Sequence, residues 1–205
     1  MKIAIMQPYF LPNLGYFQLV NCVDKFIFYD NVNFIKGGWI NKNKFRKDIY
    51  FRIPIKNQSQ NNLIMNTEIM WDDKNIDKFF KTMIHLYSSA PNFESVSKII
   101  ETIFKNRPKT IAELAIDSTI KISDYLGINT KFKISSEENY KVGINSTQSI
   151  ILICNQERAT NYVNLSGGKD LYSLREFEKA DINLSFIDSK PGVSILDYCF
   201  SKKKD

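Results

Sequence analysis

The chain has 205 residues, of which 43% are hydrophobic, 24% charged and 13% aromatic. This composition suits one globular domain and excludes collagen-like, low-complexity and disordered chains. No segment reaches the roughly 18–20 apolar residues of a membrane-spanning helix, and the first residues lack the pattern of a signal peptide. We therefore expect a single cytoplasmic domain over residues 1–205, with no membrane insertion.

The positive charge is concentrated near the N-terminus. Residues 1–60 hold nine Lys/Arg and three Asp, which accounts for the whole net charge of +6. Concentrated positive charge suits a phosphate-bearing partner such as a nucleotide, a nucleotide-linked sugar or RNA. The alternative is compositional bias, because lysine outnumbers arginine 23 to 5.

Cysteine and histidine are scarce. Cys22, Cys154 and Cys199 are odd in number and far apart, so they form neither a disulfide framework nor a zinc signature. The single histidine, His85, leaves little scope for a Ser-His-Asp or Cys-His mechanism. We expect no metal site, a partly exposed structural His85 and a core position for Cys154.

The first third reads as strand, loop, helix and strand. Residues 2–7 form a short buried strand, residues 8–15 a loop shaped by two prolines and a glycine, residues 16–22 a short helix, and residues 25–29 a second strand. This order is the opening of a parallel α/β unit. Beyond it we expect hairpin-like segments over residues 31–56, with an edge strand at Ile53–Ile55, and a polar loop at 56–67.

The middle of the chain predicts a helical insertion over about residues 75–127. Its first helix carries an apolar stripe of Ile76, Phe79, Phe80, Met83, Ile84 and Tyr87. Asn92 can cap the second helix, Thr110 and Glu113 form a capping box for the third, and Gly127 suits the end of the third.

The last third returns to mixed structure. We expect strands at 128–134, 162–165 and 184–187, helices beginning at Ser146 or Thr147 and spanning about 171–179, and a solvated tail at 202–205. The predicted fold class is α/β: a small open sheet, mixed or parallel, with an N-terminal strand-loop-helix-strand unit and a helical insertion.

The loop after the first strand is a first candidate site. It contains Gln7, Tyr9 and Gly15 at the carboxyl end of a strand, where open α/β sheets bind ligands. The helix that begins near Gly15 can offer backbone N–H groups to an anion. The alternative is a rigid connector whose prolines and aromatic rings only pack.

A second candidate follows the second strand. Its carboxylate and amides can bind hydroxyls or a base edge, its lysines can neutralise phosphates, and its tryptophan can stack on a ring. The residues are Asp30, Asn31, Asn33, Lys36, Trp39, Asn41, Lys42 and Asn43. The alternative is a basic, solvated hairpin with one structural tryptophan.

A third, weaker candidate is the segment with Ser166, Gly167, Gly168 and Tyr172. A strand followed by a glycine pair and a helix can cradle phosphate. The segment matches neither a Walker loop nor a GxGxxG fingerprint.

Residues 6–19 and 30–43 together resemble the WbqC-like family of bacterial proteins. Shorter similar pieces are Tyr87–Pro91, Ser166–Tyr172, Leu184–Phe186 and Ser194–Asp197. The chain departs from the family pattern at Met6, where a histidine is frequent, at Lys42, where arginine is usual, and near Phe79, where the family has a histidine.

The resemblance implies a tailoring enzyme of surface-polysaccharide (O-antigen) biosynthesis. Its reaction would transfer an acyl or aminoacyl group, glycyl among them, to the amine of a dTDP-linked amino sugar. Asp30 would bind hydroxyls or accept the amine proton, and Gln7 or Asn43 would stabilise an oxyanion. The donor would be an aminoacyl-tRNA, or an amino acid activated by ATP with Mg²⁺. The alternative is a non-catalytic scaffold that binds nucleotide sugars or RNA.

Overall fold

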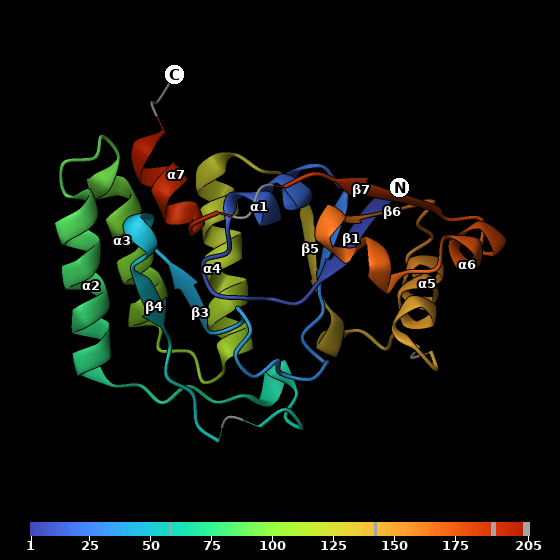
Figure 1. The fold of residues 1–205 in the computed structure, drawn as a ribbon, viewed down its shortest axis with the longest axis horizontal. Helices are drawn as coiled ribbons and strands as arrows, with labels where there is room; N and C mark the ends of the chain where they lie inside the picture. The colour runs from blue at the N-terminus through green and yellow to red at the C-terminus, as the bar shows by residue number, and fades with distance from the viewer. Residues whose placement is uncertain (58, 142, 190–191, 203–205) are drawn as a thin grey trace. The chain divides into compact units, whose positions relative to one another are not determined.

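The computed structural model describes residues 1–57, 59–141, 143–189 and 192–202 (Figure 1). The strands are β1 (Lys2–Met6), β2 (Lys25–Phe28), β3 (Lys42–Lys44), β4 (Tyr50–Arg52), β5 (Lys131–Ile134), β6 (Asn161–Leu165) and β7 (Asn183–Ile187). The helices are α1 (Leu14–Asn21), α2 (Asp73–Tyr87), α3 (Phe93–Lys105), α4 (Ile111–Leu126), α5 (Ser146–Gln156), α6 (Leu174–Lys179) and α7 (Ile195–Ser201).

The chain divides into two compact units. The sheet unit comprises Met1–Gln7, Gly15–Tyr29 and Ile128–Pro191, and the helical unit comprises Pro8–Leu14, Asp30–Gly127 and Gly192–Asp205. The predicted helical insertion, residues 75–127, therefore lies within the second unit.

The sheet unit is built on a five-stranded sheet in the order β5-β2-β1-β6-β7, in which every neighbouring pair is parallel. Strand β1 lies at the centre, where the strand order changes direction between β2 and β6. Open parallel sheets bind ligands outside the carboxyl ends of their strands at such a point. The predicted α/β fold class is confirmed.

Apolar side chains on both faces of the sheet form the core of this unit. Ile3 and Ile5 of β1 and Ile27 of β2 are buried with the α5 residues Ile153 and Cys154. Strands covered on both faces read as continuous apolar runs rather than as alternating ones, which is why the short runs in β1 and β2 predicted buried strands.

A carboxylate ties two strands to the end of α5. Glu157, whose side chain is 7% exposed, accepts hydrogen bonds from Lys25 of β2, from Lys133 of β5 at 2.8 Å and from the Tyr140 hydroxyl at 2.6 Å. Burial opposes its charge, but these hydrogen bonds outweigh the burial and lower the pKa of Glu157 to about 2.

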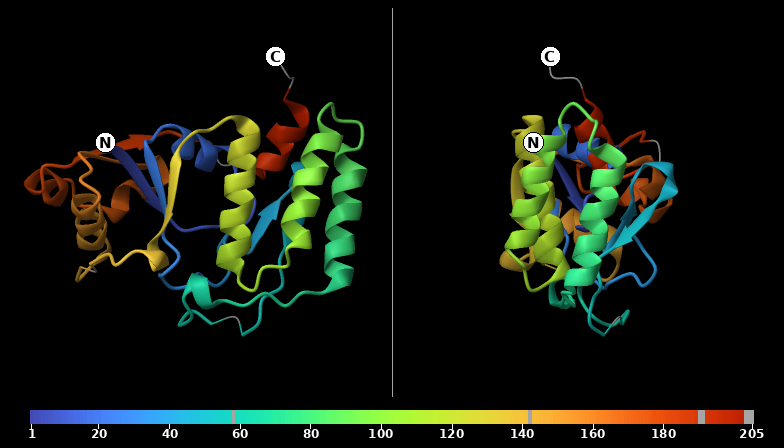
Figure 2. Two further views of the ribbon diagram at one scale, coloured as in Figure 1. Left: turned by 180° about the vertical axis from the view of Figure 1, so that it is seen from behind. Right: turned by 90° about the vertical axis from the view of Figure 1, so that its left-hand side faces the viewer.

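The helical unit contains α2, α3 and α4, whose axes lie roughly side by side in both views of Figure 2. The caps agree with the sequence. Thr110 and Glu113 form both hydrogen bonds of a capping box, and Gly127 ends α4 at a φ of +71°. Asp72 caps α2 by accepting a hydrogen bond from the backbone N–H of Lys74.

The core of the helical unit is rich in aromatic rings. Phe79 of α2 packs against Phe45, Phe51 and Phe104 with ring centroids 4.9–5.2 Å apart. The antiparallel hairpin of β3 and β4 lies beside α2 (Figure 1) and buries Asn43 and Phe51 on one face. Alternation therefore leaves Lys42, Tyr50 and Arg52 on the opposite face.

Arg46, at the turn of this hairpin, anchors α7. Its Nε lies 2.8 Å from Asp197 Oδ1, its Nη2 lies 3.0 Å from Ser201 Oγ, and its guanidinium lies 4.2 Å from the centroid of the Tyr87 ring. One side chain thus joins the turn, the end of α2 and α7.

Two predicted element boundaries are wrong. The predicted edge strand Ile53–Ile55 is displaced to Tyr50–Arg52, and Ile55 forms only an isolated bridge with Ile69. Pro54 has no N–H to extend the ladder. The helix predicted from about 171 begins at Leu174, because the chain forms a 3-10 turn over Ser166–Leu171 instead.

Two predicted side-chain roles also differ. Ile84, which we placed on the apolar stripe of α2, is 48% exposed, since Met83 and Tyr87 define the buried face one position away. Asn92 occupies the N-cap position of α3, but its amide donates to Cys199 O at 3.0 Å instead of accepting a helical N–H. The predicted tail lies outside the described residues beyond Lys202, which is exposed.

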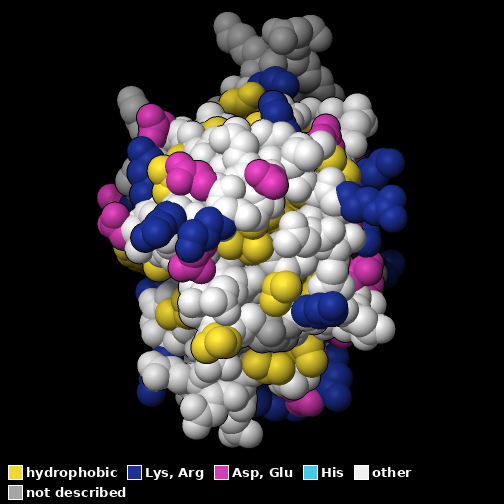
Figure 3. Space-filling model, turned by 90° about the vertical axis from the view of Figure 1, so that its right-hand side faces the viewer, with side chains coloured by type: hydrophobic (Ala, Val, Ile, Leu, Met, Phe, Trp, Pro, Cys, Tyr) yellow, Lys and Arg dark blue, Asp and Glu magenta, His cyan; other side chains and the backbone are white. Residues whose placement is uncertain are grey.

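No helix in the described part of the chain is both long and apolar enough to cross a membrane. Figure 3 views the side of α5 and α6 and shows apolar side chains as separate spots among polar ones. The exposed apolar residues of the sheet unit include Ile144, Leu171 and Leu174.

Candidate functional site

The loop before α1 is held by its own backbone and side chains. The Tyr9 hydroxyl accepts a hydrogen bond from the Asn13 N–H at 3.3 Å, and burial raises the pKa of Tyr9 well above its ordinary value. The Phe10 N–H donates to Ile40 O at 3.0 Å. Tyr9 therefore shapes the loop, and its use as a stacking ring stays a prediction.

Asp30 lies on a fixed segment of the helical unit. Its carbonyl oxygen accepts a hydrogen bond from the Met65 N–H at 3.0 Å, and Val32 O accepts one from Ile64 at 2.9 Å. The residue is only 3% exposed. Asn31 is partly buried, whereas Asn33 is exposed and forms a bridge with Leu63.

Asn41 and Asn43 are buried and hold the hairpin to neighbouring backbone. Asn41 Nδ2 donates to Ile53 O at 2.9 Å. Asn43 Nδ2 donates to Leu11 O at 2.7 Å, and Asn43 Oδ1 accepts from the Lys44 N–H at 2.9 Å. These contacts give both amides a structural role in the free protein.

Trp39, Lys42 and Tyr50 form an exposed cluster. The Trp39 and Tyr50 rings are nearly parallel, at 19° with centroids 6.4 Å apart, and are 49% and 60% exposed. Lys42 Nζ lies 5.2 Å from the centroid of the Trp39 ring. Ring faces that stay open to solvent beside a cation can stack on a base or a sugar.

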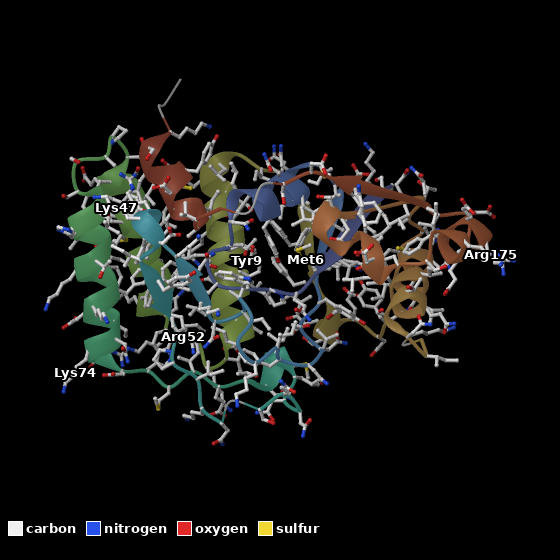
Figure 4. The ribbon with its side chains drawn as sticks, in the orientation of Figure 1. Met6, Tyr9, Lys47, Arg52, Lys74 and Arg175 are labelled. Carbon is white, nitrogen blue, oxygen red and sulfur yellow. The ribbon has the colours of Figure 1, made fainter. Side chains whose placement is uncertain are left out.

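A groove of about 380 Å³ lies between this hairpin and α2. Its walls combine cations, aromatic rings and small polar groups. The lining residues are Lys42, Phe45, Ile49, Tyr50, Phe51, Arg52, Asn75, Lys78, Phe79 and Thr82. Figure 4 labels Arg52 near the start of α2 and Lys47 at the other end of the hairpin. We call this hollow the basic groove.

The cations of the basic groove are not neutralised. Lys42 and Arg52 are direct partners in the antiparallel ladder, and Lys78 faces them from α2. Within the described part of the chain, none of the three forms an ion pair, whereas the neighbouring Lys44 is paired with Asp48 at 2.6 Å. Among the described residues, no acidic one lines the basic groove, so its positive potential is available to an anion.

Lys36 lies apart from the lining of this groove. It is exposed, at the turn that Gly37 makes with a φ of +78°. Sequence reasoning thus found Trp39 and Lys42 but missed Tyr50, Arg52, Asn75 and Lys78 as site residues. Arg52 belonged to the recognised basic cluster, while Lys78 gave no signal, because it sits on the polar face of a helix distant in sequence.

In the sheet unit, Gln7 and Ser166 follow β1 and β6, the two strands at which the strand order changes direction. Gln7 O accepts a hydrogen bond from the Tyr16 hydroxyl at 3.2 Å, and Gly15 is buried in the first turn of α1. These positions fit the edge that sequence reasoning selected, and their roles stay predictions.

The Ser166–Tyr172 segment is packed against β6. The Tyr172 hydroxyl lies 3.0 Å from the Tyr162 hydroxyl and 3.0 Å from Asn164 Nδ2. A side chain at Gly168 would meet that same Asn164 amide at 3.4 Å, while a side chain at Gly167 would point into open space. That distance is an ordinary van der Waals contact, so packing does not require a glycine at Gly168. A helix as short as α6, with six residues, is a poor phosphate cradle.

Two of the three cysteines, Cys154 and Cys199, are buried and poorly suited to nucleophilic catalysis at neutral pH. Burial raises the pKa of the Cys154 and Cys199 thiols to about 12. His85 is exposed near the end of α2 and does not line the basic groove.

Comparison with known proteins adds a relationship that spans the chain. The model of the WbqC-like protein family matches residues 7–205. The chain is 24% identical over 217 residues to the uncharacterized protein Rv1507c of Mycobacterium tuberculosis, a match that covers 98% of this chain and 93% of the relative. No solved structure matches. Since the family model covers nearly every residue, the chain belongs to the WbqC-like protein family.

Proposed function

We propose that this protein is a tailoring enzyme of surface-polysaccharide biosynthesis that acts on a nucleotide-linked amino sugar. The observation that carries this proposal is the basic groove, which is lined by three cations that form no ion pair within the described residues and by Tyr50, whose exposed ring lies beside that of Trp39. A nucleotide diphosphate combines a planar base with two adjacent anionic groups, so it matches both features at once.

The phosphates would lie between Lys42, Arg52 and Lys78. Two cations opposite each other in a hairpin repel, and a bound diphosphate would relieve that repulsion. The base would stack on Trp39 or Tyr50, which lie next to Lys42. Arginine adds directional N–H donors that suit phosphate oxygens.

The reaction we propose is acyl or aminoacyl transfer to the sugar amine. The amine nitrogen forms a bond to the carbonyl carbon of the donor, and the bond from that carbon to the leaving oxygen breaks. A carboxylate takes the proton that the amine loses, and the leaving group departs with a proton. Asp30, on its fixed segment, is the proposed carboxylate for this proton or for the sugar hydroxyls.

Two donors fit the chemistry. An aminoacyl-tRNA would present an activated ester and would bind with a strong salt dependence, because its phosphates displace counterions. An amino acid activated by ATP with Mg²⁺ would give an acyl adenylate and pyrophosphate, and AMP would be the leaving group of the later transfer. The groups of this chain that would approach either donor are the exposed lysines of the hairpin region, including Lys36 and Lys47.

The direct test is product formation. The protein is incubated with dTDP-4-amino-4,6-dideoxyglucose and either glycyl-tRNA or glycine with ATP and Mg²⁺, and the sugar nucleotide is followed by mass spectrometry. We expect a mass gain of one glycyl group with one donor, and its loss in Asp30→Asn but not in Asp124→Asn, an exposed aspartate of α4.

The outcomes separate the proposals. Turnover that falls steeply between low and high NaCl indicates the tRNA donor, while turnover insensitive to salt indicates the adenylate. Sugar-nucleotide binding without any product would indicate a non-catalytic scaffold, and affinity for unrelated RNAs without sugar-nucleotide binding would indicate an RNA-binding protein. Either result would overturn the proposed transfer.

A further inference from the structure

A second, smaller hollow adjoins the basic groove. It measures about 10 Å³ and shares Arg52, Asn75 and Phe79 with the larger groove. A space of this size holds about one water-sized group. The hollow therefore extends the groove at the start of α2, next to the residues that would hold the phosphates.

The smaller hollow has an acidic residue in its lining, whereas the described lining of the larger one has none. Asp72 lines it, together with Met70, Trp71 and Ile76. Asp72 Oδ1 accepts from the Lys74 N–H at 3.0 Å, and Asp72 Oδ2 accepts from Asn75 Nδ2 at 2.7 Å. A carboxylate can accept about four hydrogen bonds, so these two contacts fix the group and leave capacity for a ligand.

Apart from Arg52 and Asn75, the remaining walls are apolar, and the Trp71 ring is held in place. Trp71 Nε1 donates to Pro108 O at 2.9 Å, and the Trp71 ring packs edge-on against Phe104 with centroids 6.1 Å apart. An apolar wall lowers the local dielectric and strengthens an ion pair at its edge. An aromatic ring beside a carboxylate is also a favourable surface for an ammonium group.

We propose that Asp72 binds the ammonium group of the ligand and makes the site specific for amino sugars. The inference rests on the proposed function, because it places the sugar end of a nucleotide-linked sugar beyond the phosphates. Arg52 lies at the border of the two hollows and holds the phosphate, while Asp72 receives the one water-sized cationic substituent. Asp72 is then also the carboxylate that takes the proton the amine loses on transfer, and Asp30 keeps the hydroxyl-binding role.

The ammonium group fits this hollow better than a methyl group does. A methyl group would bury apolar area but would leave the carboxylate facing an apolar substituent, which costs desolvation energy without a partner. A hydroxyl would satisfy one lone pair without neutralising the charge. With Arg52 engaged by the phosphate, the cationic substituent is the one of these three that matches the size of the hollow, its acidic residue and its aromatic wall together.

The test compares two ligands that differ only at one position. Binding of dTDP-4-amino-4,6-dideoxyglucose, dTDP-6-deoxyglucose and dTDP is measured by calorimetry with the wild type, Asp72→Asn and Asp73→Asn. Asparagine still caps a helix well, so Asp72→Asn should fold. Asp73 is the matched control, because it is the next residue, is paired with Arg107 and does not line the hollow.

We expect the wild type to bind the amino sugar about ten-fold tighter than the hydroxyl sugar, the scale of a hydrogen-bonded charge pair. Asp72→Asn should lose this preference and keep its affinity for dTDP, whereas Asp73→Asn should behave as the wild type. Equal affinity for both sugars, or a preference that survives Asp72→Asn, overturns the inference while dTDP binding still supports the groove. Absence of dTDP binding overturns the proposed nucleotide site and this inference with it.

Discussion

Lys42 and Arg52 stand directly opposite each other in the β3–β4 hairpin, and within the described residues neither is paired with a carboxylate. Like charges in this position destabilise a hairpin. The charge of the neighbouring Lys44, by contrast, is compensated by an ion pair with Asp48. Two adjacent cations beside a groove, without a carboxylate partner among the described residues, can bind an anion.

Replacing one of these cations should raise the free energy of unfolding of the ligand-free protein. The same replacement should weaken the binding of the ligand. We expect Arg52→Thr to raise the free energy of unfolding by about 0.2–1 kcal/mol, as relief of a like-charge pair does. The same variant should bind dTDP about ten-fold more weakly, because a charge-assisted hydrogen bond is lost. Urea unfolding and calorimetry measure the two effects.

Arg52→Lys is the control, because it keeps the charge and loses only the guanidinium geometry. It should leave the free energy of unfolding unchanged and weaken dTDP binding less than Arg52→Thr does. If Arg52→Thr lost stability without losing affinity, the pair would be structural and the groove assignment would fail.

Trp39 should matter for binding and hardly for folding. Its ring is half exposed, so Trp39→Ala should change the free energy of unfolding by less than about 0.5 kcal/mol. Affinity for dTDP should fall about ten-fold, within the range for loss of one base–aromatic stack, and Trp39→Phe should restore part of it. Tyr198→Ala, which removes an exposed ring of α7, is the matched control. Equal affinity in the Trp39 and Tyr198 variants would exclude stacking on Trp39.

The Glu157 cluster should control the acid stability of the sheet unit. The folded-state pKa of Glu157 is about 2, below the ordinary 4.5, so its contribution is fully present above pH 4.5 and is lost as the pH falls toward 2. We expect that loss to reach about 3 kcal/mol. Unfolding curves between pH 7 and pH 2.5 test this.

Glu157→Gln should be less stable than the wild type at pH 7, and the difference should shrink steadily below pH 4.5. Glu178→Gln, an exposed residue of α6, should show no such dependence. A difference between Glu157→Gln and the wild type that stays constant with pH would show that the cluster contributes through packing rather than through charge.

The contacts of Arg46 predict that its replacement lowers the stability of the protein, whereas replacement of its neighbour Lys47 has little effect. Arg46→Ala removes the hydrogen bonds to Asp197 and Ser201 and the contact with the Tyr87 ring, and should lower the free energy of unfolding by about 1–3 kcal/mol. Lys47→Ala, next to it and exposed, should change that free energy by less than about 0.5 kcal/mol. Thermal unfolding that is equal in the two variants would contradict the anchoring role.

Much of the fold follows from local patterns in the sequence. The capping box at Thr110 and Glu113 and the left-handed Gly127 act within one turn of helix, so a single sequence reveals them. The short apolar runs of β1 and β2 likewise predict buried parallel strands. The displaced strand at Ile53–Ile55 shows the limit, because the register of a hairpin depends on its partner as well as on composition.

Less of the candidate site than of the fold could be predicted from the sequence. Trp39 and Lys42 stand out in a basic, aromatic segment, but Lys78 and Asp72 belong to α2 and approach the hairpin only through packing. The side-chain amide of Asn43 is of the kind that can stabilise an oxyanion, yet it is buried and donates a hydrogen bond to Leu11 O. Burial and partner choice are properties of the folded chain.

Binding of a nucleotide diphosphate in the basic groove is the step on which the proposed function depends. Its most direct test is isothermal titration of dTDP into the wild type, the double variant Lys42→Ala/Lys78→Ala, and Lys105→Ala, an exposed lysine of α3 outside the groove. We predict saturable binding to the wild type and to Lys105→Ala, and a loss of at least about ten-fold in the double variant. Binding of equal strength to all three proteins, or no binding to the wild type, would contradict the account.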